Sequence, residues 1–202
     1  MTKSIRVLAL IATIAALGTS AYAQVEQPSQ ITVQGTALIG KSTDGNGSTY
    51  DTTKSGGFLL GYSYQFSSWA GVEGNYGYTR NTQNYFGLSR TSLLEANVHE
   101  VTGSFVAHIP TNVHGIRPYA LAGAGALIFD PTTKYVVAGS QSQTKAAFVY
   151  GAGINFDVVK NFGIRAEYRG LVYKAPDFTL DSLNIDKITD LAQLSVGFFF
   201  KF

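Results

Sequence analysis

Apolar and polar residues alternate with a period of two along most of the chain after residue 30. In the segment FGIRAEYRGLVY, for example, Arg165, Glu167 and Arg169 each stand between smaller or apolar residues. Alternation of this kind is typical of β-strands that have one apolar and one polar face. The pattern predicts eight strands, over residues 31–41, 55–66, 69–80, 95–109, 116–129, 145–157, 162–173 and 190–202.

The connections between these strands alternate strictly between long and short. The long connections are polar and cover residues 42–54, 81–94, 130–144 and 174–190, whereas the short ones cover 67–68, 110–115 and 158–161. In an up-and-down antiparallel sheet, this order puts all long loops at one end, and all tight turns and both termini at the other. An even number of strands with this layout is typical of an outer-membrane β-barrel.

Side-chain size indicates which face of the sheet meets lipid. The apolar face is crowded with Phe and Tyr, and the polar face is rich in Gly, Ala and Ser. The interior of an eight-stranded barrel is only wide enough for side chains to fill it. We therefore expect an all-β, transmembrane, antiparallel eight-stranded up-and-down barrel with the aromatic face outside. The alternative is a soluble lipocalin-type barrel, which would turn the apolar face inward.

Aromatic residues also gather where the predicted strands end. Two such rings are typical of the interfacial girdles of a membrane barrel, although aromatic residues are also common in the strands of soluble sheets. The residues expected in the girdle at the tight-turn end are Phe66, Trp69, Tyr119, Phe156, Phe162 and Phe202. Those expected in the girdle at the long-loop end are Tyr78, Tyr85, Phe129, Tyr135 and Tyr173.

The first 23 residues have the features of a secretory signal peptide. Lys3 and Arg6 precede an apolar stretch over residues 7–17, and Ala21-Tyr22-Ala23 fits a cleavage site. We expect a signal peptide over 1–23, a periplasmic lead-in over 24–30 and the barrel over 31–202. An uncleaved anchor helix is the alternative. No later apolar run approaches 18 residues, so any further membrane span is expected to consist of strands.

Composition excludes several other classes of protein. The chain has 202 residues, no cysteine and only 14% charged residues, which is low for a soluble domain. Disulfides, thiolate metal ligands and cysteine nucleophiles are therefore absent. Loss of the expected signal peptide, with its two basic residues, takes the formal net charge from +2 to about 0, so a nucleic-acid partner is not expected.

Three stretches of the chain resemble a known family, the small eight-stranded outer-membrane barrels of the OmpA-like or opacity type, with their OmpX and Ail relatives. RPYALAGAGALIF (117–129) resembles the family's Pro-Tyr, Gly/Ala-rich strand, and GIRAEYRGLVYKAPDF (163–178) resembles its Arg-rich penultimate strand. The ending with Phe198, Phe200 and Phe202 resembles the signal read by the barrel-assembly machinery. The resemblance implies the outer membrane of a Gram-negative-type bacterium, with its lipid and lipopolysaccharide as surroundings. We do not expect a counterpart of OmpA's peptidoglycan-binding domain, so the resemblance does not imply cell-wall anchoring.

Five charged residues fall on the predicted inward face of the barrel. Charges in a narrow, dry lumen are costly unless they are paired, and arginine can hold a carboxylate through two hydrogen bonds. We expect a buried ionic plug that makes the barrel rigid. The alternative is a small gated, porin-like pore in which the pairs exchange partners. The five residues are Glu73, Glu100, Arg165, Glu167 and Arg169.

No catalytic, cofactor or metal site is predicted. Barrels that modify lipids use a histidine with a serine and an acid, and here His99 adjoins Glu100. Adjacent residues of a strand point to opposite faces, however, and Ser89 or Ser92 would reach His99 only through loop geometry. No His/Asp/Glu cluster has the spacing of metal ligands. The glycines at 123–125 lie inside a predicted strand rather than in a nucleotide-binding loop.

The four long loops are the expected working surface, because function tends to lie in loops on a rigid scaffold. Their residues suit contact with lipopolysaccharide or with a host or cell-surface ligand, although solvated loops often have a similar composition. The sequence thus predicts a non-enzymatic surface protein with a role in envelope integrity, adhesion or resistance. The candidate contact residues are Tyr50, Tyr85, Phe86, Arg90, Tyr135 and Phe178.

Overall fold

The structure is a computed structural model. It describes residues 26–40, 43–45, 48–52, 55–87, 91–110, 115–132, 141–176 and 187–202. The expected signal peptide over 1–23 lies outside these residues. Within the described part of the chain, no helix is long and apolar enough to cross a membrane.

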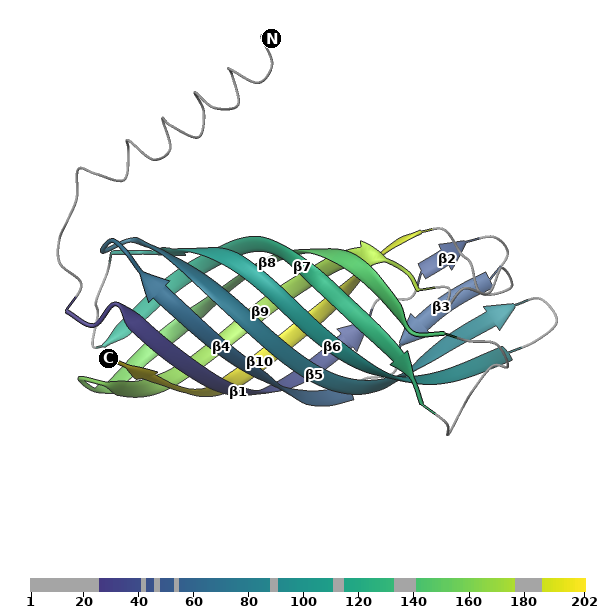
Figure 1. The fold of residues 1–202 in the computed structure, drawn as a ribbon, viewed down its shortest axis with the longest axis horizontal. Helices are drawn as coiled ribbons and strands as arrows, with labels where there is room; N and C mark the ends of the chain where they lie inside the picture. Colours follow the sequence, from purple (N-terminus) through teal and green to yellow (C-terminus); the bar gives the residue numbers. More distant parts are fainter. Residues whose placement is uncertain are drawn as a thin grey trace, which may run out of the picture.

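Eight long antiparallel strands form a closed barrel (Figure 1). Each strand pairs with the next long strand in the sequence, and the last pairs with the first. The predicted all-β fold and its up-and-down order are confirmed. Closure leaves no open sheet edge within the barrel, which is what a bilayer demands of a β-structure. The strands are β1 (Ser29–Gly40), β4 (Ser55–Gln65), β5 (Ala70–Gly87), β6 (Thr91–His108), β7 (Ile116–Pro131), β8 (Gln143–Val159), β9 (Phe162–Lys174) and β10 (Ile188–Lys201).

The seam between β1 and β10 closes the barrel. Its register runs from Gln30 opposite Lys201 to Gly40 opposite Leu191. Beyond this register, the backbones of Ser29 and Phe202 exchange two hydrogen bonds, of 3.2 and 2.9 Å. The aromatic ending is therefore part of the closing strand. β1 begins at Ser29, inside the segment expected as a periplasmic lead-in.

The segment 81–94, predicted as a loop, mostly continues the strands on either side of it. β5 extends to Gly87 and β6 begins at Thr91, and the two stay in register as far as Phe86 opposite Thr91. Two short strands of the first long connection, β2 (Thr43–Gly45) and β3 (Ser48–Thr52), join them, because β3 pairs with β5. These segments lack an apolar face, so alternation did not reveal them. Pairing with a neighbouring strand supports them instead.

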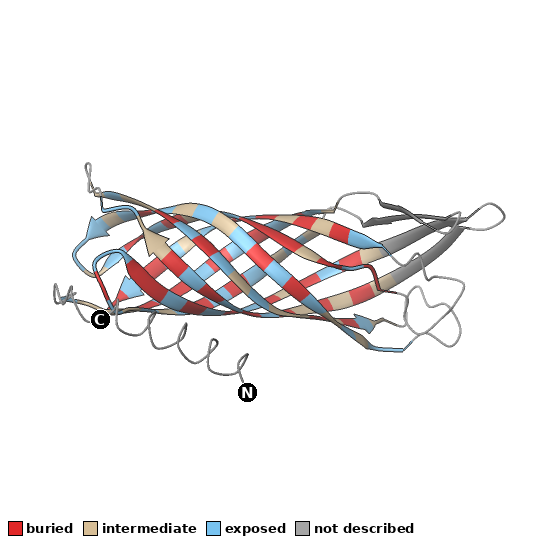
Figure 2. Cartoon of the chain, turned by 90° about the horizontal axis from the view of Figure 1, so that it is seen from above, coloured by how far each residue is buried: buried red, intermediate tan, exposed pale blue. Residues whose placement is uncertain are grey.

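Buried and exposed residues alternate along every strand of the barrel (Figure 2). The aromatic face is on the outside, as the sequence predicts, since most of its side chains are between 37% and 56% exposed. Water would not tolerate an apolar surface of this extent, whereas lipid does. The exposed aromatic residues are Phe58, Tyr62, Tyr64, Phe66, Trp69, Tyr76, Phe105, Phe148, Tyr150, Phe156, Phe162, Tyr168, Phe198, Phe200 and Phe202.

Three aromatic residues predicted for the interfacial girdles lie inside the barrel instead. Tyr119, Phe129 and Tyr173 are 2%, 1% and 4% exposed. Their positions alternate in phase with the inward residues of β7 and β9, and a glycine makes room for Tyr119. A Cβ atom at Gly153, for example, would collide with the Tyr119 ring. Of the remaining girdle residues at the long-loop end, Tyr78 is half-buried, and the side chain of Tyr85 and the whole of Tyr135 lie outside the described part.

Candidate functional site

Arg165 lies at the centre of an ionic cluster inside the barrel. Its Nη1 and Nη2 atoms donate to the two carboxylate oxygens of Glu73 across the lumen, at 2.7 and 3.0 Å. Nη2 also donates to Glu167, which stands on the same face of β9. The side chains of Arg165 and Glu73 are buried. Residues of β5 and β9 are thus tied together through the middle of the barrel.

Arg169 extends this cluster toward the long-loop end. Its Nη1 atom donates to Glu100 Oε1 at 2.9 Å, and its Nη2 atom donates to Thr102 Oγ1 at 2.9 Å. Its Nε atom lies 3.7 Å from Glu167 Oε1. Gln193 Nε2 donates to the second oxygen of Glu100 at 3.2 Å. The structure therefore brings all five predicted lumen charges together, and each carboxylate has an arginine partner.

Two further side chains complete the ionic cluster, and the sequence analysis missed both. The Tyr119 hydroxyl donates to Glu167 Oε2 at 2.6 Å, and its ring lies 4.5 Å from the guanidinium carbon of Arg165. Asn75 Nδ2 donates to Glu73 Oε1 at 2.9 Å. Polar neighbours of this kind offset the desolvation of buried charges. Arg117 and Tyr119 are two positions apart on β7 and therefore share a face, so an inward Arg117 would have indicated that Tyr119 also points inward.

A second group of charges stands at the tight-turn end of the lumen. Asp157 accepts from Lys201 Nζ at 2.5 Å and from Arg117 Nη2 at 3.2 Å, and Arg117 Nε lies 2.9 Å from its other oxygen. Lys201 Nζ also lies 5.1 Å from the centre of the buried Phe199 ring. The side chains of Lys201, Arg117 and Asp157 are 11%, 21% and 24% exposed. Solvent thus reaches this end of the lumen.

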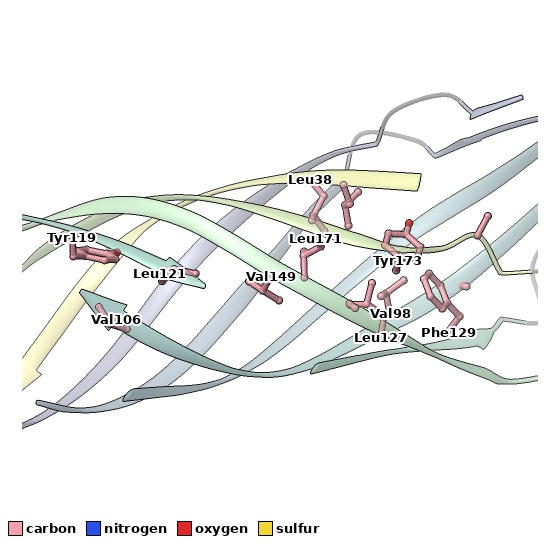
Figure 3. Packing of buried hydrophobic residues seen from close by; sticks show 14 residues of the cluster. Leu38, Val98, Val106, Tyr119, Leu121, Leu127, Phe129, Val149, Leu171 and Tyr173 are labelled. Carbon is pink, nitrogen blue, oxygen red and sulfur yellow. The ribbon is translucent and has the colours of Figure 1, made fainter. Parts of the chain in front are cut away.

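Part of the buried apolar cluster forms a layer in the lumen toward the long-loop end (Figure 3). The rings of Phe129 and Tyr173 are 5.7 Å apart within it. The expectation of a polar interior lined by small residues is therefore wrong for this part of the barrel. The sequence analysis did not predict this layer, because its residues share the inward face of their strands with polar and charged residues, and the whole face was interpreted as polar. It consists of Leu38, Val98, Leu127, Phe129, Val149, Leu171, Tyr173 and Leu191, all at most 4% exposed.

The candidate loop residues are only partly described. Tyr50 of β3 stands opposite Tyr85 of β5 in the backbone register, and Phe86 stands opposite Thr49. Candidates from two long connections thus meet in one sheet. The other candidates, Arg90, Tyr135 and Phe178, lie outside the described residues.

Among the described side chains considered for catalysis, His99 and Glu100 do not come together. His99 is on the outer wall, where its Nδ1 atom lies 2.8 Å from the Tyr76 hydroxyl. Glu100 points inward to Arg169. Ser92 is described by its backbone alone, and Ser89 is outside the described residues. In the described segments, no group of three or more His, Cys, Asp or Glu residues could hold a metal ion.

Comparisons with known proteins agree with this geometry. The model of the family described as "Outer membrane protein beta-barrel domain" matches residues 9–202. The attachment invasion locus protein of Yersinia enterocolitica is 28% identical over 171 residues, which cover 83% of this chain and 88% of that protein.

Solved structures with the same fold include two outer-membrane proteins. The attachment invasion locus protein Ail of Yersinia pestis, solved in complex with the heparin analogue sucrose octasulfate, is 25% identical, with a TM-score of 0.55 over 88% of this chain and 100% of that chain. OprG of Pseudomonas aeruginosa is 13% identical, with a TM-score of 0.66 over 87% of this chain and 96% of that chain, and shows the fold alone. The resemblance stated from the sequence is confirmed. The chain belongs to the outer membrane protein beta-barrel domain family, and it is a protein of the outer membrane of Gram-negative-type bacteria.

Proposed function

We propose that this protein is a non-enzymatic surface protein that acts in adhesion, resistance or envelope integrity through its extracellular side. The observation that carries the proposal is the extension of β5 and β6 beyond the barrel. β5 pairs with β4 as far as Thr79 opposite Gly57, and from Gln83 onward it pairs with β3. We call β2, β3 and the outer ends of β5 and β6 the extracellular sheet.

The extracellular sheet is suited to recognition because its backbone is already ordered. A surface held by strand pairing loses less conformational entropy on binding than a free loop does. Its outer strands also present backbone groups that an extended segment of a partner can pair with. Figure 1 shows this sheet projecting past the end of the barrel.

The composition of the sheet favours a protein ligand over a sulfated glycan. Its segments contain Asp44, Asp51 and Glu95, and no lysine or arginine lies within the strands at residues 43–52, 83–87 and 91–95. A polyanion such as the heparin analogue bound by Ail of Yersinia pestis needs basic partners. Tyr50, Tyr85 and neighbouring Ser, Thr and Asn residues resemble the amphipathic surfaces that bind proteins.

The interior of the barrel supports the role of a rigid scaffold. Glu73 pairs with Arg165 and Glu100 pairs with Arg169, so no partner exchange is needed to satisfy either acid. This arrangement favours the ionic plug over a gate formed by the same residues. The likeness to an attachment protein over 83% of the chain adds support for adhesion.

Surface expression tests the proposal directly. The protein is produced in a non-adherent Gram-negative strain, and attachment to cultured host cells is compared with that of the empty strain. We expect attachment to rise, and the double substitution Tyr85→Ala/Phe86→Ala to reduce it about tenfold, because aromatic residues often dominate such interfaces.

The matched control is Tyr64→Ala, which removes an aromatic side chain from the lipid-facing wall far from the extracellular sheet. It should leave attachment unchanged at equal surface levels. Attachment no greater than that of the empty strain would contradict the role in adhesion. Equal losses for the two variants would show that the extracellular sheet is not the binding surface.

A further inference from the structure

Inward-facing side chains change from polar to apolar along the strands toward the long-loop end. On β9, the inward residues Arg165, Glu167 and Arg169 are followed by Leu171 and Tyr173. All five are at most 4% exposed, so the change is one of chemistry rather than of burial. The ionic cluster and the apolar layer therefore occupy successive levels of the same lumen.

The same order recurs on the two strands of the closing seam. On β1, Thr32, Gln34 and Thr36 precede Leu38, and on β10 the inward Gln193 precedes Leu191 in the same direction. β6 also follows it, since Glu100 and Thr102 lie on the periplasmic side of Val98. β5 departs from this order because Thr79 and Asn81 continue its polar face past Asn75. β6 and β10 follow it above the ionic cluster, but each also places one buried apolar side chain, Val106 and Phe199, nearer the tight-turn end.

The polar part of the lumen contains buried groups that lack a protein partner. Thr32 Oγ1, Gln34 Nε2 and Thr36 Oγ1 form a file along β1, beside the ionic cluster, and none has a hydrogen bond among the described residues. Gln193 Oε1, Ser104 Oγ and Asn155 Oδ1 are in the same condition. Buried polar atoms of this kind are ordinarily satisfied by water. Partly exposed charges at the periplasmic end give that water a way in.

We propose that the lumen is hydrated from the periplasm up to the ionic cluster, and that the apolar layer is the barrier that closes the barrel to ions. A salt-bridged cluster is hydrophilic and leaves a polar file beside it, so it does not exclude water. An apolar constriction excludes water and ions by dewetting. If substitutions make the apolar layer polar, water and ions can continue toward the long-loop end along the polar inward face of β5.

Conductance of the full chain in a planar bilayer tests the proposal. We expect no channels from the wild type, discrete openings from Leu127→Ser/Leu171→Ser, and no channels from Arg165→Ala. The matched control is Leu194→Ser/Leu60→Ser, which changes two leucines on the lipid-facing wall and should be silent. A conducting wild type, a conducting Arg165→Ala variant or a folded but silent layer variant would each overturn the proposal.

Cysteine labelling tests from which side water reaches the lumen, and it does not depend on whether the layer variants fold. The chain has no cysteine, so Thr32→Cys places a single thiol on the polar file below the apolar layer. A small, charged thiol reagent that does not cross membranes is added to intact cells, and separately to cells whose periplasm has been opened to it. We expect labelling from the periplasmic side to be at least tenfold faster. Equal rates from both sides, or no labelling from either, would refute the proposal.

Discussion

Arg165 and Glu73 form a two-bond salt bridge between β9 and β5, 92 positions apart in the sequence. The pair crosses the lumen and connects opposite walls of the barrel. Both side chains are almost completely buried. The barrel therefore contains an electrostatic crosslink that the strand ladder alone does not provide.

Removing the cation from this crosslink should destabilise the barrel strongly. Arg165→Ala leaves Glu73 without its guanidinium partner in a buried site, which ordinarily costs about 3–5 kcal/mol, and leaves Glu167 with Arg169 alone. The free energy of unfolding in urea, measured in lipid vesicles, checks this expectation.

The double variant Arg165→Met/Glu73→Leu serves as the comparison, because it removes both charges of the bridge. It should recover most of the lost stability, since a buried ion pair is often no better than apolar residues of similar size. A double variant less stable than Arg165→Ala would show that the salt bridge adds net stability to the barrel, beyond neutralising the two charges it buries.

The Tyr119 hydroxyl should stabilise the ionic cluster through Glu167. Tyr119→Phe keeps the ring beside Arg165 but removes the 2.6 Å hydrogen bond to the carboxylate. We expect a loss of about 1.5–3 kcal/mol in the free energy of unfolding, the usual range for a hydrogen bond to a charged group. Tyr64→Phe on the outer wall is the control and should change stability by less than about 0.5 kcal/mol. Equal effects would refute the assigned role of Tyr119.

Two glycines of the barrel wall should respond oppositely to the same substitution. A Cβ at Gly163 would collide with the backbone carbonyl oxygen of Phe156 and with the inward ring of Phe199, whereas a Cβ at Gly74 meets no atom within 4 Å. Gly163→Ala should therefore cost about 1–3 kcal/mol through overpacking, and Gly74→Ala should be neutral or slightly stabilising. Thermal unfolding in detergent measures both. A neutral Gly163→Ala variant would mean that both the Phe199 ring and the β8 backbone at Phe156 can shift to make room for a methyl group.

The terminal aromatic ring should matter for assembly more than for stability. Phe202 has two backbone hydrogen bonds to Ser29, and its side chain is exposed on the outer wall. Phe202→Ala keeps the backbone bonds, so unfolding of the refolded protein should change by less than about 1 kcal/mol. In cells, we expect the folded fraction in the outer membrane to fall severalfold if the barrel-assembly machinery reads the ring. An unchanged folded fraction would contradict that role.

The fold was predictable because lipid imposes a strict alternation on every strand that crosses it. Each strand of the barrel was placed within a few residues wherever one face is apolar, as on β9 and β10. Alternation failed for β2, β3 and the outer ends of β5 and β6, which lie outside that constraint. The same period of two that placed the aromatic residues on the outside predicted that the charged residues point inward.

The lumen was less predictable, because its packing depends on which strands face one another. Tyr119 and Phe129 looked like girdle residues from their places near strand ends, and only the phase of β7 reveals that both point inward. The pairing of Glu73 with Arg165 needed the register of strands far apart in sequence. The sequence identifies these charges but not their partners.

Because Ser29 pairs with Phe202, the two ends of the barrel lie side by side, and the strands could be synthesised in a different order without changing their neighbours in the sheet. Since the two ends of the barrel are adjacent, a short linker would join them, and new ends opened in one of the long connections would yield a circular permutant. Its sheet would be the same, but the aromatic ending would become an internal segment. Such a permutant would distinguish what β10 contributes as a strand from what it contributes as the last strand of the barrel to be synthesised.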